Sequence, residues 1–245
     1  MAALQLSRAL CRRRTSLLPV FFFLAGAGSA GAAEPFVTDD ARIIERGTCK
    51  IEVGQRGQSQ GRDVWLLPAC NLIFDMELEF AHVRSWRDDE PRDSSRAVQA
   101  KGLWREIERD GYGLGWFVNT GFKRHPGPGE SRVREHGAAL LTTYPVIADR
   151  LTLHANVGAR YNRDDRRGEL TAGILAEVEI DKRFAVLAEV YDTSRSHIGW
   201  QAGVRFSIVP DHLDLSITRG GDDAAFRGRR YWAVSVEITS PKLTR

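Results

Sequence analysis

The 245-residue sequence predicts an all-β protein, a transmembrane antiparallel up-and-down β-barrel with a short periplasmic N-terminal segment. Three observations carry this prediction. Long segments alternate between polar and apolar residues, an export signal precedes them, and the connections between them alternate in length. We expect about 12 strands, because that many segments show the alternation of a strand.

The alternation is clearest in the segments 151–161, 169–180 and 198–208, where apolar residues occupy every second position. A strand points successive side chains to opposite faces, so each of these segments presents one apolar face and one polar face. Their lengths suit a tilted strand that crosses a bilayer in about 9–11 residues. Strands of soluble proteins are usually nearer to about 5–6 residues.

The same pattern recurs along the rest of the chain after the N-terminal region. The predicted strands are Cys49–Arg56, Asp63–Cys70, Met76–Arg84, Val98–Arg105, Gly113–Phe122, Glu135–Pro145, Leu151–Tyr161, Glu169–Ile180, Phe184–Tyr191, Ile198–Val209, Leu213–Arg219 and Arg230–Thr239.

The connections between these strands indicate two different barrel ends. Polar and mostly long connections, such as 85–97, 123–134 and 220–229, alternate with short ones such as 146–150 and 181–183. Outer-membrane barrels have short periplasmic turns and longer outer loops. A soluble β-sandwich has no reason for this asymmetry.

The N-terminus has the three-part layout of a secretory signal peptide. A basic region with Arg8 and Arg12–Arg14 is followed by an apolar run over 17–27 and then by small residues. We therefore expect a signal peptide over 1–33, a periplasmic segment over 34–48, the barrel over 49–240 and a tail over 241–245. The expected location is the cell outer membrane.

Two cysteines, Cys49 and Cys70, lie beyond the signal peptide. In a hairpin of the first two predicted strands they stand directly opposite each other, where cross-strand Cβ atoms are about 4.5–5.5 Å apart. In an exported protein this favours a disulfide. Neither cysteine has a second Cys or His at zinc-ligand spacing.

Alternation alone does not say which face lies inside, because a lipocalin-type barrel places its apolar face in the lumen. The export signal, the alternating connections and the charges in mid-strand favour the membrane barrel, with apolar residues facing lipid. The polar face then lines the lumen. The predicted lumen-lining residues are His154, Asn156, Arg160, Glu177, Glu179, Glu189 and Arg205.

The region just after the signal peptide resembles a known bacterial family. The run from Pro35 through Thr38, Asp39 and Asp40, followed by Gly47 and a strand with a Glu, is similar to outer-membrane β-barrels related to the transporter encoded with the phenol meta-cleavage degradation pathway. The resemblance implies a barrel of about a dozen strands and uptake of hydrophobic compounds. It implies no catalytic residue.

The residues leave three functions open. The first is a channel or transporter for small, hydrophobic molecules, and the second is a structural or adhesive outer-membrane protein with a sealed lumen. The third is a hydrolase that uses His154 with Glu177 and Glu189, although acids and bases in a narrow lumen more often pair to rigidify it. We expect no enzyme activity, metal or cofactor.

The composition restricts the partners. A net charge of +3 is too balanced to indicate nucleic-acid binding, so none is expected. The expected partners are outer-membrane lipid, lipopolysaccharide and a small hydrophobic solute. Basic residues of the outer connections could bind lipopolysaccharide phosphates, although aspartates lie beside them. Those residues are Arg166, Arg167, Arg227, Arg229 and Arg230.

Overall fold

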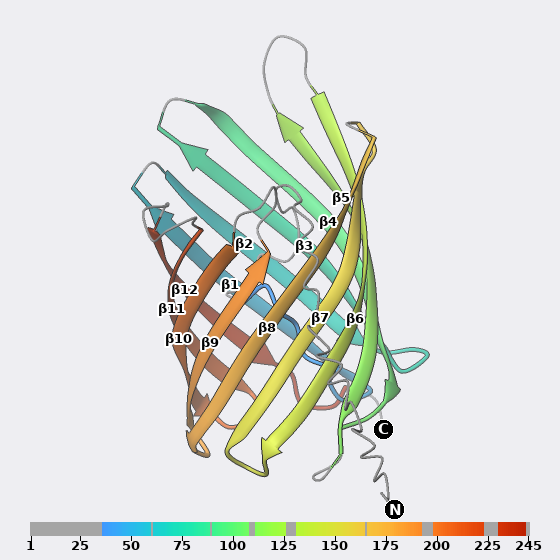
Figure 1. Cartoon of the computed structure of the whole chain (residues 1–245), viewed down its shortest axis with the longest axis vertical. Coiled ribbons are helices and arrows are strands. Elements are labelled where there is room, and N and C mark those ends of the chain that lie inside the picture. Colours follow the sequence, from blue (N-terminus) through green and yellow to red (C-terminus); the bar gives the residue numbers. More distant parts are fainter. Residues whose placement is uncertain are drawn as a thin grey trace, which may run out of the picture.

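The computed structural model describes residues 36–59, 61–88, 90–107, 111–125, 131–164, 166–192, 198–222 and 230–243. These residues form one closed barrel of twelve antiparallel strands, in which each strand pairs with its sequence neighbours and β1 pairs with β12 (Figure 1). Closure satisfies the backbone groups of every strand, which a barrel in lipid requires. The predicted fold class is confirmed.

The strands are longer than those of most soluble sheets. They are β1 (Thr48–Gln58), β2 (Gly61–Asn71), β3 (Met76–Arg87), β4 (Glu90–Arg105), β5 (Gly113–His125), β6 (Ser131–Ile147), β7 (Leu151–Asn162), β8 (Arg167–Asp181), β9 (Phe184–Asp192), β10 (Ile198–Val209), β11 (Leu213–Asp222) and β12 (Arg230–Thr239).

The expected contrast in connection length is smaller than predicted. The connection expected over 85–97 is mostly strand, because β3 continues to Arg87 and β4 begins at Glu90. Polar residues extend these hairpins beyond the ring, and the hairpin of β5 and β6 rises furthest in Figure 1. We call the end where β1 begins and β12 ends the turn end, and the opposite end the loop end.

The outer surface is apolar and the inner surface is polar. Val157 and Ile174 are 62% and 60% exposed, whereas His154 and Glu177 on the same two strands are 1% and 3% exposed. Since alternate residues face opposite sides of a strand, one parity of each strand lies outside and the other lies in the lumen. The predicted orientation, with apolar side chains outward, is confirmed.

The first hairpin has the predicted register. Cys49 stands opposite Cys70 in the pairing of β1 with β2, and the two residues form a disulfide. The bridge ties the first two strands together at the turn end. The predicted disulfide is confirmed.

Buried apolar side chains fill part of the interior. One cluster centres on Trp65, Leu67 and Tyr231 of β2 and β12. Two other clusters include residues that precede β1, namely Phe36 and Ala41. The residues before β1 therefore contribute to the packing inside the barrel.

Candidate functional site

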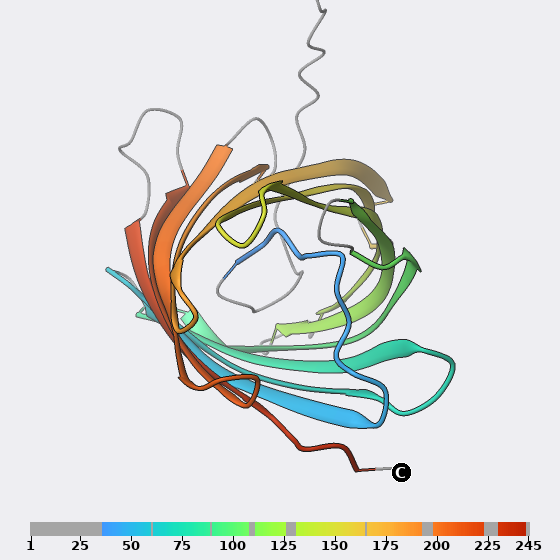
Figure 2. The ribbon, with the colours of Figure 1, turned by 90° about the horizontal axis from the view of Figure 1, so that it is seen from below.

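Residues 36–44, which precede β1, lie inside the ring of strands. Seen from below in Figure 2, the blue segment crosses the interior of the ring before it joins β1. We call residues 36–47 the inner segment. Ala41 at its centre is fully buried, and Phe36 packs against Leu175, Ala185 and Leu187 of the wall. The segment expected at the periplasmic base thus reaches into the lumen.

A carboxylate on β9 holds the first residues of the inner segment. The main-chain N–H of Val37 donates to both oxygens of Glu189, at 2.9 and 3.1 Å, and the N–H of Thr38 donates to one of them at 3.1 Å. Gln201 of β10 donates to the same carboxylate at 3.1 Å. Two successive main-chain N–H groups of the inner segment thus bind one side chain of β9.

Two neutral side chains hold the middle of the inner segment. The N–H of Ala41 donates to the Thr143 hydroxyl at 2.7 Å. Asn156 forms a pair of bonds with Asp39, in which its amide oxygen accepts from the main-chain N–H at 2.7 Å and its NH₂ donates to the carbonyl at 2.8 Å. The middle of the segment is therefore held by β6 and β7.

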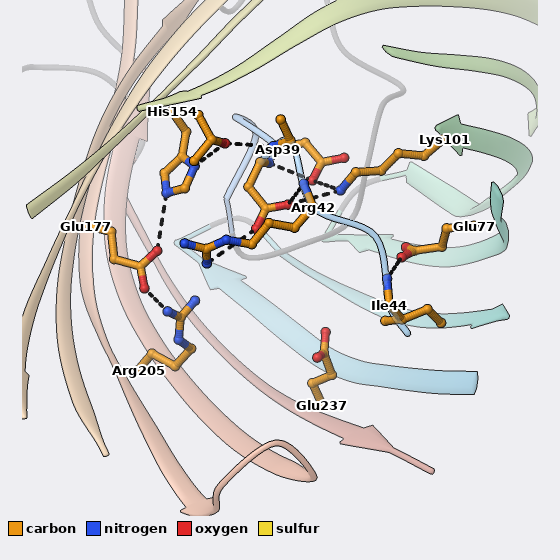
Figure 3. Close-up of polar contacts among 12 residues, drawn as sticks. Asp39, Arg42, Ile44, Glu77, Lys101, His154, Glu177, Arg205 and Glu237 are labelled. Atoms are coloured by element: carbon orange, nitrogen blue, oxygen red, sulfur yellow. Dashed lines mark hydrogen bonds and ion pairs between the residues drawn. The ribbon is translucent and has the colours of Figure 1, made fainter. Parts of the chain in front are cut away.

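The last part of the inner segment is held at the opposite wall. The N–H of Ile44 donates to Glu77 of β3 at 3.0 Å (Figure 3). Asn71 of β2 donates to the Ile44 carbonyl at 2.8 Å. The inner segment thus extends from β9 on one side of the lumen to β2 and β3 on the other.

One lysine binds the side chains of the inner segment. The ammonium of Lys101, on β4, lies 2.7 Å from Asp39 Oδ1 and 3.2 Å from Asp40 Oδ1 (Figure 3). Lys101 is only 4% exposed, so its charge depends on these carboxylates for compensation.

The two aspartates differ in their electrostatic state. Burial raises the pKa of Asp39, and this effect outweighs the opposing charge of Lys101. Burial also acts to raise the pKa of Asp40, but the charges of Lys101 and Arg42 outweigh it and hold that pKa well below its usual value. Asp40 is therefore the carboxylate that stays ionised against Lys101.

A glycine on β8 makes room for the inner segment. A Cβ atom added to Gly173 would lie 2.3 Å from Thr38 Oγ1 and 3.4 Å from Thr38 Cβ. Because any larger residue would meet Thr38 there, the lumen wall is shaped for this segment.

A second polar network crosses the wall from β6 to β10. The His154 ring lies between Thr143 Oγ1, 2.9 Å from Nδ1, and Glu177 Oε2, 3.2 Å from Nε2. Arg205 donates to the other oxygen of Glu177 (Figure 3). These buried groups pair with one another and connect neighbouring strands.

The order hydroxyl, imidazole and carboxylate is also the order of a nucleophile, base and acid in hydrolases. Here the Thr143 hydroxyl is completely buried, and its oxygen already accepts the Ala41 N–H. With the inner segment in place, no ester or amide carbon can reach that oxygen. The geometry therefore supports a structural role for the network.

Cavities lie on both sides of the inner segment. One, of about 260 Å³, is lined by charged residues that include Lys50, Glu52, Glu77 and Glu237. Another, of about 100 Å³, is lined by Phe117, Asn119, Arg160 and Thr171. Thr38 and Asp39 line both cavities, so the inner segment separates them.

The structure brings most of the predicted lumen residues into one interior. His154, Glu177 and Arg205 form the network above, while Asn156 and Glu189 hold the inner segment. Arg160 pairs with Glu169 at 2.9 Å on the loop-end side. Glu179 has the inward parity but is exposed near the turn end, outside the network.

Among the predicted motif residues, Thr38, Asp39 and Asp40 lie in the inner segment, and Pro35 lies outside the described residues.

The sequence reasoning missed several residues that hold the inner segment, namely Asn71, Glu77, Lys101, Thr143 and Gly173. A usable signal existed for Glu77 and Lys101, because each is a charge at the inward parity of a predicted strand. Their partners in the inner segment have no periodic pattern that would reveal the contact.

Within the described ranges, no group of three or more His, Cys, Asp or Glu side chains could hold a metal ion. The described residues also contain no helix long and apolar enough to cross a membrane.

Comparison with known proteins gives the family. The family described as "Uncharacterised conserved protein UCP029691" matches residues 20–238. The chain belongs to this family. No curated protein matches the sequence at a significant level.

Several porins of known structure have a fold similar to that of this chain. A KdgM porin shares 12% identity, covers 77% of this chain and 98% of its own, and superposes with a TM-score of 0.57. The KdgM porin in complex with disordered oligogalacturonate shares 13% identity over the same fractions, with a TM-score of 0.56. A NanC porin shares 8% identity over 78% of this chain and 98% of its own, with a TM-score of 0.51. At these identities the likeness concerns the fold.

Proposed function

We propose that this chain is an outer-membrane channel for small solutes whose passage is closed by its own inner segment. One observation carries the proposal: wall side chains from β2, β3, β4, β6, β7 and β9 hold residues 37–44 across a polar lumen. Cavities on both sides of that segment supply the two halves of the passage.

The outer surface supports a place in the outer membrane. Its many exposed apolar side chains suit hydrocarbon, and charged side chains such as Glu77, Lys101 and Glu177 are buried inside. The turn end then faces the periplasm, with lipid around the apolar side chains and lipopolysaccharide near the loop end. Arg166 and Arg167 belong to that end, whereas Arg227 and Arg229 lie outside the described residues.

The lumen favours a polar solute. The wall and the larger cavity contain both carboxylates and cations, which would penalise an apolar molecule that displaced their water. Uptake of hydrophobic compounds, which the family resemblance implies, stays a prediction. Vesicle uptake of a phenol against that of a polar solute of similar size would decide between the two.

The porins with a similar fold make a channel a reasonable proposal, and one of them is described in complex with an oligogalacturonate. The filled lumen favours a second candidate, a structural barrel that never opens. The two candidates differ in one measurable property, the current through a single barrel.

The test is planar-bilayer conductance of the full-length protein and two glycine variants. Gly173→Val places side-chain atoms where Thr38 lies, so the open fraction should rise by about tenfold or more. Gly168→Val on the same strand is the matched control, because a Cβ there meets nothing closer than 4.0 Å. If a folded Gly173→Val barrel passes no current, the channel proposal is wrong and the second candidate, a structural barrel that never opens, is supported.

A further inference from the structure

The contacts that hold the inner segment are directed at its main chain. Glu189 accepts from the N–H of two successive residues, Val37 and Thr38. Thr143 and Glu77 accept from single main-chain N–H groups further along. Asn156 and Asn71 bind the carbonyls of Asp39 and Ile44.

Such contacts do not depend on side-chain identity. Every residue except proline offers one N–H donor and one carbonyl acceptor at the same spacing. Among the described residues between 36 and 44, polar recognition of side chains by the wall is confined to Lys101, which binds Asp39 and Asp40. Another peptide with an acid at that place would satisfy the same wall groups.

We infer that the lumen is a binding track for extended peptides, and that the inner segment is its resident occupant. This inference deepens the proposed function, on which it rests, by naming short peptides as the solute class. A peptide in trans would occupy the track once the inner segment leaves it.

The geometry favours a peptide over a sugar. Asn156 pairs with both the N–H and the carbonyl of one residue, as a neighbouring strand would. Glu189 accepts from the main-chain N–H groups of two adjacent residues, and the distance between these donors is set by the polypeptide backbone. Sugar hydroxyls can donate to the carboxylates but do not offer an amide that pairs with Asn156.

The track also predicts which peptides bind. The Lys101 ammonium lies 3.2 Å from Asp40 Oδ1, so an acidic residue at the place of Asp40 should be required. Proline should be rejected at the places of Val37, Thr38, Ala41 and Ile44, because each donates its N–H to the wall. Phe36, Thr38 and Ala41 are buried against the wall, so their places should accept only side chains of similar size. The side chains of Val37 and Ile43 line the cavities and should matter little.

The experiment adds labelled peptides to a barrel that lacks residues 36–44, and to full-length Asp40→Asn, whose own inner segment should dock more weakly on an unaltered wall, in case the deletion prevents folding. The first peptide has the sequence of residues 36–44. The second differs from it only at the places of Val37 and Ile43, whose side chains line the cavities. The third has the first sequence with N-methyl groups at the places of Thr38, Ala41 and Ile44. A neutral oligosaccharide is the fourth probe, and fluorescence anisotropy and current blockade are measured.

The first and second peptides should bind within about threefold of each other and block the current, and the N-methylated peptide should bind at least about tenfold more weakly. Equal binding of the N-methylated peptide, loss of binding by the second peptide, or preferential binding of the oligosaccharide overturns the inference. If the barrel conducts but binds no peptide, the peptide inference is wrong and the channel proposal still holds. If the barrel binds peptide but never conducts, the peptide-binding track is supported and the channel proposal is wrong.

Discussion

The ammonium of Lys101, near the turn end of β4, lies 2.7 Å from the carboxyl group of Asp39 on the inner segment. Asp40 Oδ1 lies 3.2 Å from the same ammonium, so one buried cation binds two acidic side chains from a single stretch of chain. A buried lysine that loses its partners is strongly unfavourable. This contact therefore couples the charge balance of the wall to the position of the inner segment.

Replacing this lysine should release the inner segment. In Lys101→Met, Asp39 would lose its cation and Asp40 would keep only Arg42, whose guanidinium lies 3.9 Å away. Leaving the lumen would return both acidic side chains to water. The expected loss is about 3 kcal/mol of docking free energy, which corresponds to more than about a hundredfold change in the closed-to-open ratio. Single-channel recording measures this ratio directly.

Lys123→Met is the matched control, because Lys123 pairs with Asp93 of β4 rather than with the inner segment, and its side chain is 39% exposed. It should leave the closed-to-open ratio unchanged. If Lys101→Met closes as often as the unaltered barrel, the lysine does not hold the segment.

The contribution of Asp40 should depend on pH in a defined direction. Burial opposes ionisation of Asp40, but Lys101 and Arg42 lower its pKa below the usual value. A carboxyl group with a lowered folded-state pKa contributes stability that is complete above the unfolded value of about 4 and is lost as the pH falls through the lower folded value. Docking by Asp40 should therefore persist between pH 7 and pH 5.

The measurement is the closed-to-open ratio of the unaltered barrel and of Asp40→Asn across this range. Their difference should be constant from about pH 7 to pH 5 and should shrink only below about pH 4. Subtraction removes the titration of groups whose pKa does not depend on the Asp40 charge. A difference that vanishes by pH 5 would contradict the assignment of Asp40 as the ionised partner.

Much of the wall could be predicted from sequence. Successive side chains of a strand point to opposite faces. Once the apolar face is assigned to the outside, the direction of each remaining side chain follows, and this predicts His154 and Glu177 in the lumen. The disulfide followed from the same logic, because a hairpin register puts Cys49 opposite Cys70.

The contents of the lumen could not be predicted in this way. Asp39 precedes the first strand and follows no periodicity, and its contact with Lys101 joins chain positions 62 residues apart. The contact depends on the closure of the barrel and on the space at Gly173, which are tertiary properties. The lengths of the outer connections were overestimated because a polar sequence does not show where a strand ends. Strands such as β3 and β4 continue through polar residues.

The network around Glu177 should contribute to stability rather than to gating. In Glu177→Leu, Arg205 and His154 would lose their shared partner inside the wall, which should lower the free energy of unfolding by about 3 kcal/mol. Glu169→Leu removes a pair that is nearer to solvent and should cost about 1 kcal/mol. Urea unfolding in lipid vesicles, followed by tryptophan fluorescence, compares the two variants. Equal stability of Glu177→Leu and the unaltered barrel would argue against a structural network.

A reversible covalent link between the wall and the inner segment offers the sharpest test of closure. A Cβ at position 173 would lie 3.4 Å from the Cβ of Thr38, close to the range of about 3.5–4.5 Å that disulfides span. The double variant Thr38→Cys with Gly173→Cys should therefore be locked shut when oxidised. Reduction should free the segment and raise the open fraction, because the side chain at position 173 then disfavours docking.

Each single-cysteine variant serves as the control for reduction of Cys49–Cys70 and should show no change on reduction. A current that is the same in the oxidised and reduced double variants would mean that the inner segment does not control the passage.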